Sequence, residues 1–138
     1  MGDGARRELY RDRYISVHLE REGQLLRLAR TATPYADLQA VRDSFAAVIA
    51  AFDRVGRKGR TMLFDTRAPI GRNDPEFEQV MAGLRPRIDA GFLRIGVLVR
   101  SAVGALQLRR WVSNDGVERI VTTDEDELLR ILFPPGPG

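Results

Sequence analysis

Cysteine is absent from the 138 residues of this sequence, and histidine occurs once, as His18. The lack of thiols excludes disulfide bonds, zinc–thiolate sites, iron–sulfur clusters and cysteine nucleophiles, and it is usual for an intracellular protein. A single imidazole also excludes zinc sites built on two histidines and leaves His18 as the only base for a Ser-His-Asp triad. We therefore expect no metal site and no cofactor.

Long apolar segments are absent as well. No stretch approaches the roughly 20 apolar residues of a membrane span, and the opening residues MGDGARRELY lack the apolar core of a signal peptide. The sequence therefore predicts a cytoplasmic protein with no membrane span.

Lysine is nearly absent, because Lys58 is the only lysine among 22 basic residues and arginine supplies the other 21. Arginine suits bidentate binding of anions, but here it is spread along the chain among 19 acids, which is typical of a solvated surface. The basic loop at residues 54–60 has no aromatic residues between its cations, and a net charge of +3 predicts weak phosphate affinity. We expect no nucleic-acid partner.

What the sequence does contain is an alternation of strand and helix patterns. Residues 14–20 and 24–30 alternate apolar and polar side chains around the turn Arg21-Glu22-Gly23, which predicts an opening β-hairpin. Residues 60–65 and 92–99 contain short apolar runs typical of strands buried on both faces. A fifth strand is expected at 118–122, and right-handed crossovers place the two buried strands parallel and side by side.

Apolar residues at helical spacing predict about four helices between these strands. The firmest begins at Asp74, an N-cap followed by proline and glutamate, with Pro86 expected to kink it. The predicted ranges are 37–56, 74–91, 101–113 and, after a capping box at 123–126, the segment to 133. The result is an α/β domain with a five-stranded mixed sheet over residues 14–133, a basic N-terminal arm at 1–13 and a Pro/Gly tail at 134–138.

This order of elements, with Asp65 ending a buried strand directly before a loop and a capped helix, resembles the STAS domains, the SpoIIAA-like anti-sigma-factor antagonists, over roughly residues 14–133. Members that switch by phosphorylation carry Asp-Ser-Ser here and present the second serine to a kinase. The matching triplet is Asp65-Thr66-Arg67, so Arg67 replaces the phosphoacceptor, and the loop at 68–73 is longer. The resemblance implies the fold and an interaction module without the phosphoswitch.

The usual ligand site of an open α/β sheet is the crevice at the carboxyl ends of its strands. The loops that start there predict a ligand- or partner-binding site made of Asp65, Thr66, Arg67, Arg72, Asn73, Arg100 and Ser101. Its three arginines suit an anion, with Asp65 orienting Arg67 or Arg72. An equal alternative is that Asp65 and Asn73 cap backbone groups while the arginines point into water.

No catalytic set emerges, because the only bases near Thr66 and Ser101 are acids and His18 lies on the distant opening strand. We therefore predict a protein that is not an enzyme, and first a STAS-like regulatory module that docks on a protein partner through residues 65–75 and the second helix. The alternative is a binder of a small anionic or lipid ligand held between the second and third helices and the sheet ends; a hydrolase is the third choice. A homodimer is also considered, because an edge strand and Trp111 need cover.

Overall fold

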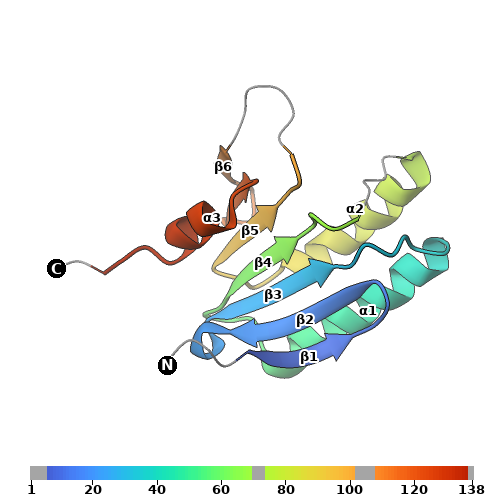
Figure 1. Ribbon diagram of the computed structural model, residues 1–138, viewed down its shortest axis with the longest axis horizontal. Coiled ribbons are helices and arrows are strands. Elements are labelled where there is room, and N and C mark those ends of the chain that lie inside the picture. The colour runs from blue at the N-terminus through green and yellow to red at the C-terminus, as the bar shows by residue number, and fades with distance from the viewer. Residues whose placement is uncertain (1–5, 70–73, 102–107, 137–138) are drawn as a thin grey trace.

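The computed structural model describes residues 6–69, 74–101 and 108–136, which form one mixed sheet with helices on both faces (Figure 1). The strands are β1 (Arg7–Arg11), β2 (Ile15–Glu20), β3 (Leu25–Arg30), β4 (Thr61–Asp65), β5 (Arg94–Leu98), β6 (Leu108–Val112) and β7 (Glu118–Thr122). The helices are α1 (Leu38–Val55), α2 (Pro75–Asp89) and α3 (Glu125–Leu132), and a short 3₁₀ turn spans Arg21–Gly23. The strand order is β1-β2-β3-β4-β5-β7-β6.

The centre of the sheet is parallel and its edges are antiparallel. Strands β3, β4, β5 and β7 run the same way, and Asp65 at the end of β4 pairs with Leu98 at the end of β5. This confirms the α/β class, the opening hairpin and the two adjacent buried strands. The expected counts were wrong for the described residues, which contain seven strands and three α-helices where five strands and about four helices were predicted.

The predicted helix at 101–113 is the clearest error. Residues Leu108–Val112 form β6 instead, antiparallel to β7, with Trp111 paired to Arg119. The turn at 114–116 ends in Gly116 with φ +78°, so an Asn-Asp-Gly sequence closes a hairpin here. Pairing with β7 satisfies the backbone of a segment whose helical pattern was irregular; residues 102–107 lie outside the described part of the chain.

The N-terminal segment also differs from the expected basic arm, because Arg7–Arg11 forms β1 and pairs antiparallel with β2. Asp12 holds the turn between them. Its side chain accepts hydrogen bonds from the backbone of Tyr14 and Ile15 and from the hydroxyls of Tyr10 and Ser44, the last from α1. The sequence pattern alone did not reveal this added edge strand.

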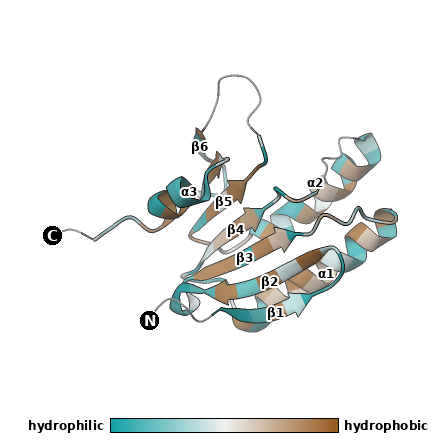
Figure 2. Cartoon of the chain, in the orientation of Figure 1, coloured by the Kyte–Doolittle hydropathy of each residue, from teal (hydrophilic) through white to brown (hydrophobic). Residues whose placement is uncertain are grey.

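Two hydrophobic cores lie on opposite faces of the sheet (Figure 2). Helices α1 and α2 cover the larger core, which includes Phe45 and Met62. Helix α3 covers the smaller one by placing Leu128 and Leu132 over β5. A Cβ atom on Gly96 would lie 2.9 Å from the Cδ1 atoms of both leucines, so this close approach requires glycine.

Acidic caps define the helix starts, and arginines hold some of their ends. Asp37, Asp74 and Asp124 each accept a backbone N–H of the first turn; the cap of α3 is thus Asp124, one residue after the Thr123 at which the expected capping box begins. Arg57 donates to the carbonyls of residues 87, 88 and 90, where α2 ends, and Arg60 donates to the carbonyls of residues 55 and 56, where α1 ends. Two cations of the basic loop at 54–60 are therefore bonded within the chain.

Candidate functional site

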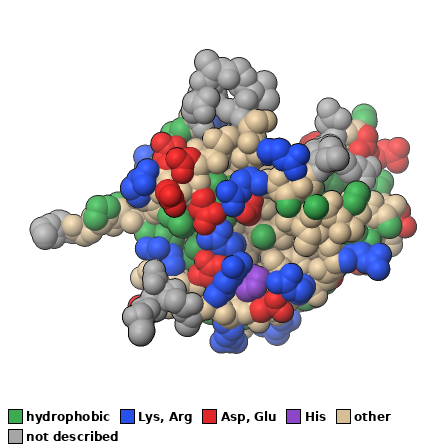
Figure 3. Space-filling view, viewed as in Figure 1, with side chains coloured by type: hydrophobic (Ala, Val, Ile, Leu, Met, Phe, Trp, Pro, Cys, Tyr) green, Lys and Arg blue, Asp and Glu red, His purple; other side chains and the backbone are tan. Residues whose placement is uncertain are grey.

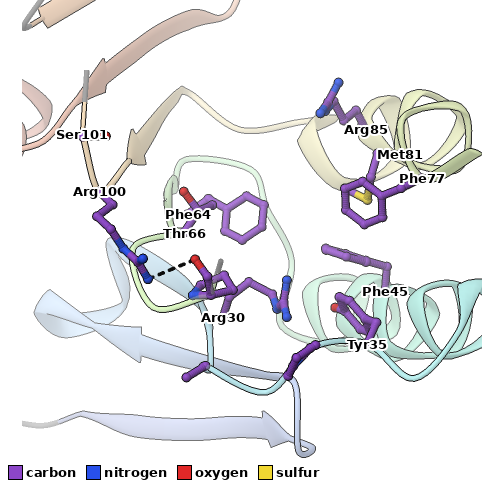
Figure 4. Close-up of a pocket in the computed structure, with 13 residues that line it drawn as sticks. Arg30, Tyr35, Phe45, Phe64, Thr66, Phe77, Met81, Arg85, Arg100 and Ser101 are labelled. Atoms are coloured by element: carbon purple, nitrogen blue, oxygen red, sulfur yellow. Dashed lines mark hydrogen bonds between the residues drawn. The ribbon is translucent and has the colours of Figure 1, made fainter. Parts of the chain in front are cut away.

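A cavity of about 620 Å³ opens where β3 and β4 end, between the sheet and helices α1 and α2 (Figure 4). Its described lining draws on each of these elements and on the segment after β5: Arg30, Ala32, Pro34, Tyr35, Phe45, Phe64, Thr66, Pro69, Phe77, Met81, Arg85, Arg100 and Ser101. We call it the α1–α2 cavity. It lies at the carboxyl edge of the sheet, where the topology favours ligand binding.

Aromatic side chains and a methionine form the walls. Phe64 reaches up from β4 toward Phe45 of α1, and the two rings meet edge to face with centroids 6.3 Å apart. Phe77 and Met81 stand one helical turn apart on α2, so both face the same space (Figure 4). Tyr35, in the loop before α1, closes the end near the hairpin. The interior is therefore mostly apolar.

Arg30 brings a positive charge to this wall. Its Nε donates to the Tyr14 carbonyl at 3.0 Å, its Nη2 donates to the Thr33 carbonyl at 3.0 Å, and its guanidinium lies 4.2 Å from the centre of the Tyr35 ring. Burial lowers the pKa of Arg30 from its ordinary value. The Asp12 carboxylate is near enough to favour its charge, but no acidic side chain among the described residues forms an ion pair with Arg30.

Arg100 brings a second such charge. Its Nε donates to the carbonyl of Arg67, and its Nη2 donates to those of Ala68 and Pro69 at 2.7 and 3.1 Å, which ties the loop after β4 to the end of β5. It too lacks an ion-paired acid among the described residues. Arg85, the third arginine of the lining, lies 3.8 Å from the Glu78 carboxylate.

The sheet divides the predicted site between its two faces. Thr66, Arg100 and Ser101 line the α1–α2 cavity, where the Thr66 hydroxyl donates to the Leu98 carbonyl at 2.7 Å. Asp65 and Arg67 lie on the opposite face. Arg72 and Asn73 fall outside the described residues. The described members of the predicted set therefore share one edge of the sheet but do not form one pocket.

Asp65 does orient Arg67, as the sequence suggested. Its carboxylate accepts from the backbone N, the Nε and the Nη2 of Arg67 at 3.0, 2.9 and 2.7 Å, and Nη2 also donates to Glu125 at 2.9 Å. Burial alone would raise the pKa of Asp65, but the hydrogen bonds and charge of Arg67 lower it overall. Arg67 is thus held by two carboxylates of its own chain.

Asp65 and Arg67 belong to a group of charged residues around a cleft of about 380 Å³. We call this group the charged cluster; it consists of Arg6, Glu20, Arg27, Asp65, Arg67 and Glu125. Acids and arginines alternate in it, and Arg27 bridges Glu20 at 2.9 Å and Glu125 at 3.1 Å. Figure 3 shows this face, with basic and acidic side chains beside the histidine. The cluster ties the start of α3 to β3 and β4, which is a structural role.

His18 lies buried on the same face as the charged cluster and far from the α1–α2 cavity. Its Nε2 is 3.5 Å from the Glu8 carboxylate, and its Nδ1 is 3.4 Å from the Arg6 guanidinium. Burial, followed by the charge of Arg6, lowers the pKa of His18. Neither of these two interactions involves a residue that lines the α1–α2 cavity.

Sequence reasoning missed Arg30, Tyr35, Phe45, Phe77 and Met81. A signal for Arg30 existed, because β3 runs parallel to β4 and its end belongs to the same sheet edge. The other four looked like ordinary core residues. The third helix, beside which the sequence analysis placed the alternative ligand, is strand β6 in its described part, and the α1–α2 cavity lies between the first and second helices.

Comparisons with known proteins leave the site to be judged on its geometry. Within residues 6–69, 74–101 and 108–136, no group of three or more His, Asp or Glu side chains is arranged to hold a metal ion. None of the helices in those ranges is long and apolar enough to cross a membrane. No family model, curated protein or solved structure matches this chain.

Proposed function

We propose that this chain is a binding domain for a small organic anion with an apolar body, and that the α1–α2 cavity is the binding site. The observation that carries the proposal is the pair of arginines without carboxylate partners, Arg30 and Arg100, at an aromatic-walled cavity. Arg30 is half-buried, and a partly desolvated charge is unfavourable unless it is paired, whereas Arg100 is exposed. An anionic ligand would supply the missing partner.

The size and polarity of the cavity support the proposal. Small-molecule sites commonly enclose about 300–1,000 Å³, with apolar walls and a few placed polar groups, and this cavity of about 620 Å³ has both features. All charged side chains among its described lining are arginines. The site therefore favours anions and disfavours cations.

The STAS-like identity suggested by the order of elements is retained as part of this proposal, as a binding module with no catalytic role. The first sequence hypothesis, docking of a protein through residues 65–75, receives less support from the described contacts. Arg67, its central residue, is already bonded to Asp65 and Glu125. We therefore place the ligand-binding function first.

The proposal is tested by titrating the purified chain with 1-anilinonaphthalene-8-sulfonate, a fluorescent anion with an apolar body. We expect one saturable site and a roughly tenfold to hundredfold weaker Kd in Arg30→Met and in Arg100→Met, because each removes charge-assisted hydrogen bonds worth about 1.5–3 kcal/mol. Arg110→Met is the matched control, since Arg110 of β6 pairs with Glu118 of β7 and does not line the cavity. Equal affinities in all four proteins would reject the proposal.

A further inference from the structure

We infer that the ligand is an unbranched hydrocarbon chain ending in an oxyanion, a carboxylate or a phosphate, with its head at Arg30 and Arg100 and its chain between Phe45, Phe77 and Met81. The inference deepens the proposed function and rests on it. It follows from which donor groups remain available, from what the walls lack, and from how their rings are oriented.

The donors of Arg30 and Arg100 lie near the strand ends, whereas Arg85, paired with Glu78, lines the cavity from α2 beside Met81 (Figure 4). In both arginines Nε and Nη2 are taken by backbone carbonyls, and Nη1 makes no hydrogen bond with another described residue in Arg30 or in Arg100. The two side chains approach from different strand ends, with the end of β4 between them. Two separate amino groups suit a terminal head with at least two oxygens, such as a carboxylate or a phosphate.

Apart from the hydroxyls of Tyr35 and Ser101, the uncharged side chains of the walls offer no free hydrogen-bonding group to the rest of the ligand. Phe45, Phe64 and Phe77 carry no polar side-chain atoms, and the Thr66 hydroxyl already donates to the Leu98 carbonyl. A nucleobase or sugar would bury amide or hydroxyl groups there without partners, which is unfavourable. A hydrocarbon has no such groups. The chemistry of the walls therefore selects an apolar body that carries its polar atoms at one end.

The orientation of the rings favours a chain over a flat ring system. Phe45 meets Phe64 at an interplanar angle of 74° and Tyr35 at 38°, so no two rings in these contacts are parallel. A flat aromatic ligand gains most when it stacks between such faces. Met81, with its flexible thioether, adapts to a chain of variable shape. The space therefore fits a flexible chain.

The inference predicts a specific dependence on chain length. Each methylene taken from water into the cavity should tighten Kd about fourfold, until the cavity is full. The head should matter independently of the chain. Octanol and octylammonium should bind at least tenfold more weakly than octanoate or octyl phosphate, because neither presents an oxyanion to the two guanidinium groups.

The test is isothermal titration calorimetry of the full chain with hexanoate, octanoate and decanoate below their micelle concentrations, with naphthalene-2-carboxylate as the flat anion. Met81→Trp and Phe77→Trp fill the chain end of the cavity, and we expect each to weaken decanoate at least tenfold while changing hexanoate less than twofold. Arg110→Met, on β6 and outside the cavity lining, is expected to change every Kd less than threefold. Thermal unfolding of each variant checks that it is folded.

The outcomes separate the inference from the function on which it rests. A fourfold tighter Kd for each added methylene, lost in the Trp variants, would support a ligand with a hydrocarbon chain. Affinity independent of chain length, or naphthalene-2-carboxylate bound more tightly than decanoate, would overturn the inference and leave an anion-binding domain. If neither the alkyl anions nor anilinonaphthalene sulfonate bind, both are overturned.

Discussion

Substitution of Gly96 by alanine tests whether α3 is packed onto the sheet as closely as the structure shows. The added Cβ would lie 2.9 Å from a terminal methyl of Leu128 and of Leu132, and 3.1 Å from a second methyl of Leu128. Both leucines are buried, so neither can swing into solvent. Overpacking of a well-filled core costs about 1–3 kcal/mol. Because the contacts are with methyl ends and not with backbone, we expect the lower part of this range, about 1–2 kcal/mol.

Urea unfolding followed by circular dichroism measures this loss. Gly83→Ala is the matched control: Gly83 lies in α2 with nothing within 4 Å of its Cβ position, so alanine there should stabilise the protein by up to about 1 kcal/mol through helix propensity. In a Leu132→Ala background the penalty of Gly96→Ala should shrink by at least about 0.5 kcal/mol, since the two sites are in contact. A Gly96→Ala protein as stable as the parent would refute the close packing of α3 on β5.

Two further predictions concern arginine contacts. Arg57→Ala should lower the free energy of unfolding by about 2–3 kcal/mol, because it removes the donor to the carbonyls at the end of α2. Urea unfolding should show no comparable loss in the control Arg42→Ala, which is on the exposed side of α1. Equal losses in the two variants would contradict this role of Arg57. Burial raises the pKa of Asp65, but the hydrogen bonds and charge of Arg67 lower it by more than burial raises it. The folded pKa therefore lies below the ordinary 3.8. The pair therefore stabilises the fold above pH 3.8 and loses this effect as pH falls through the folded pKa; unfolding between pH 6 and 2.5 should show a steeper loss in the parent than in Asp65→Asn, and parallel curves would refute it.

Arginine does more here than its even spread along the sequence suggested. Arg57, Arg60 and Arg100 each donate to two or more backbone carbonyls where a helix or a strand has just ended. A planar guanidinium with five N–H groups can bridge several carbonyls at once, which an ammonium group does less well. Part of the abundance of arginine therefore has a structural reason, which is to bind carbonyls at the ends of helices and strands. Arg30 also donates to two backbone carbonyls, and in addition it lines the α1–α2 cavity.

The sequence by itself determined the elements whose signals are local. The β-hairpin of β2 and β3 follows from alternation around a three-residue turn, and α1 and α2 follow from apolar spacing after the caps Asp37 and Asp74. These signals act within one or two turns of chain, so neighbouring residues suffice to predict them. The parallel pairing of β4 with β5 followed from the right-handed crossover rule.

Only the tertiary structure decided the rest. Strands β1 and β6 exist because β2 and β7 offer hydrogen bonds to them, and short segments such as these take the conformation that their partners complete. The α1–α2 cavity depends on how far apart two helices settle over the sheet, which no local pattern encodes. Asp65 and Thr66, adjacent in sequence, lie on opposite faces because successive residues of an extended chain point to opposite sides of the sheet. Which of these faces holds the aromatic cavity depends on the helices that cover it.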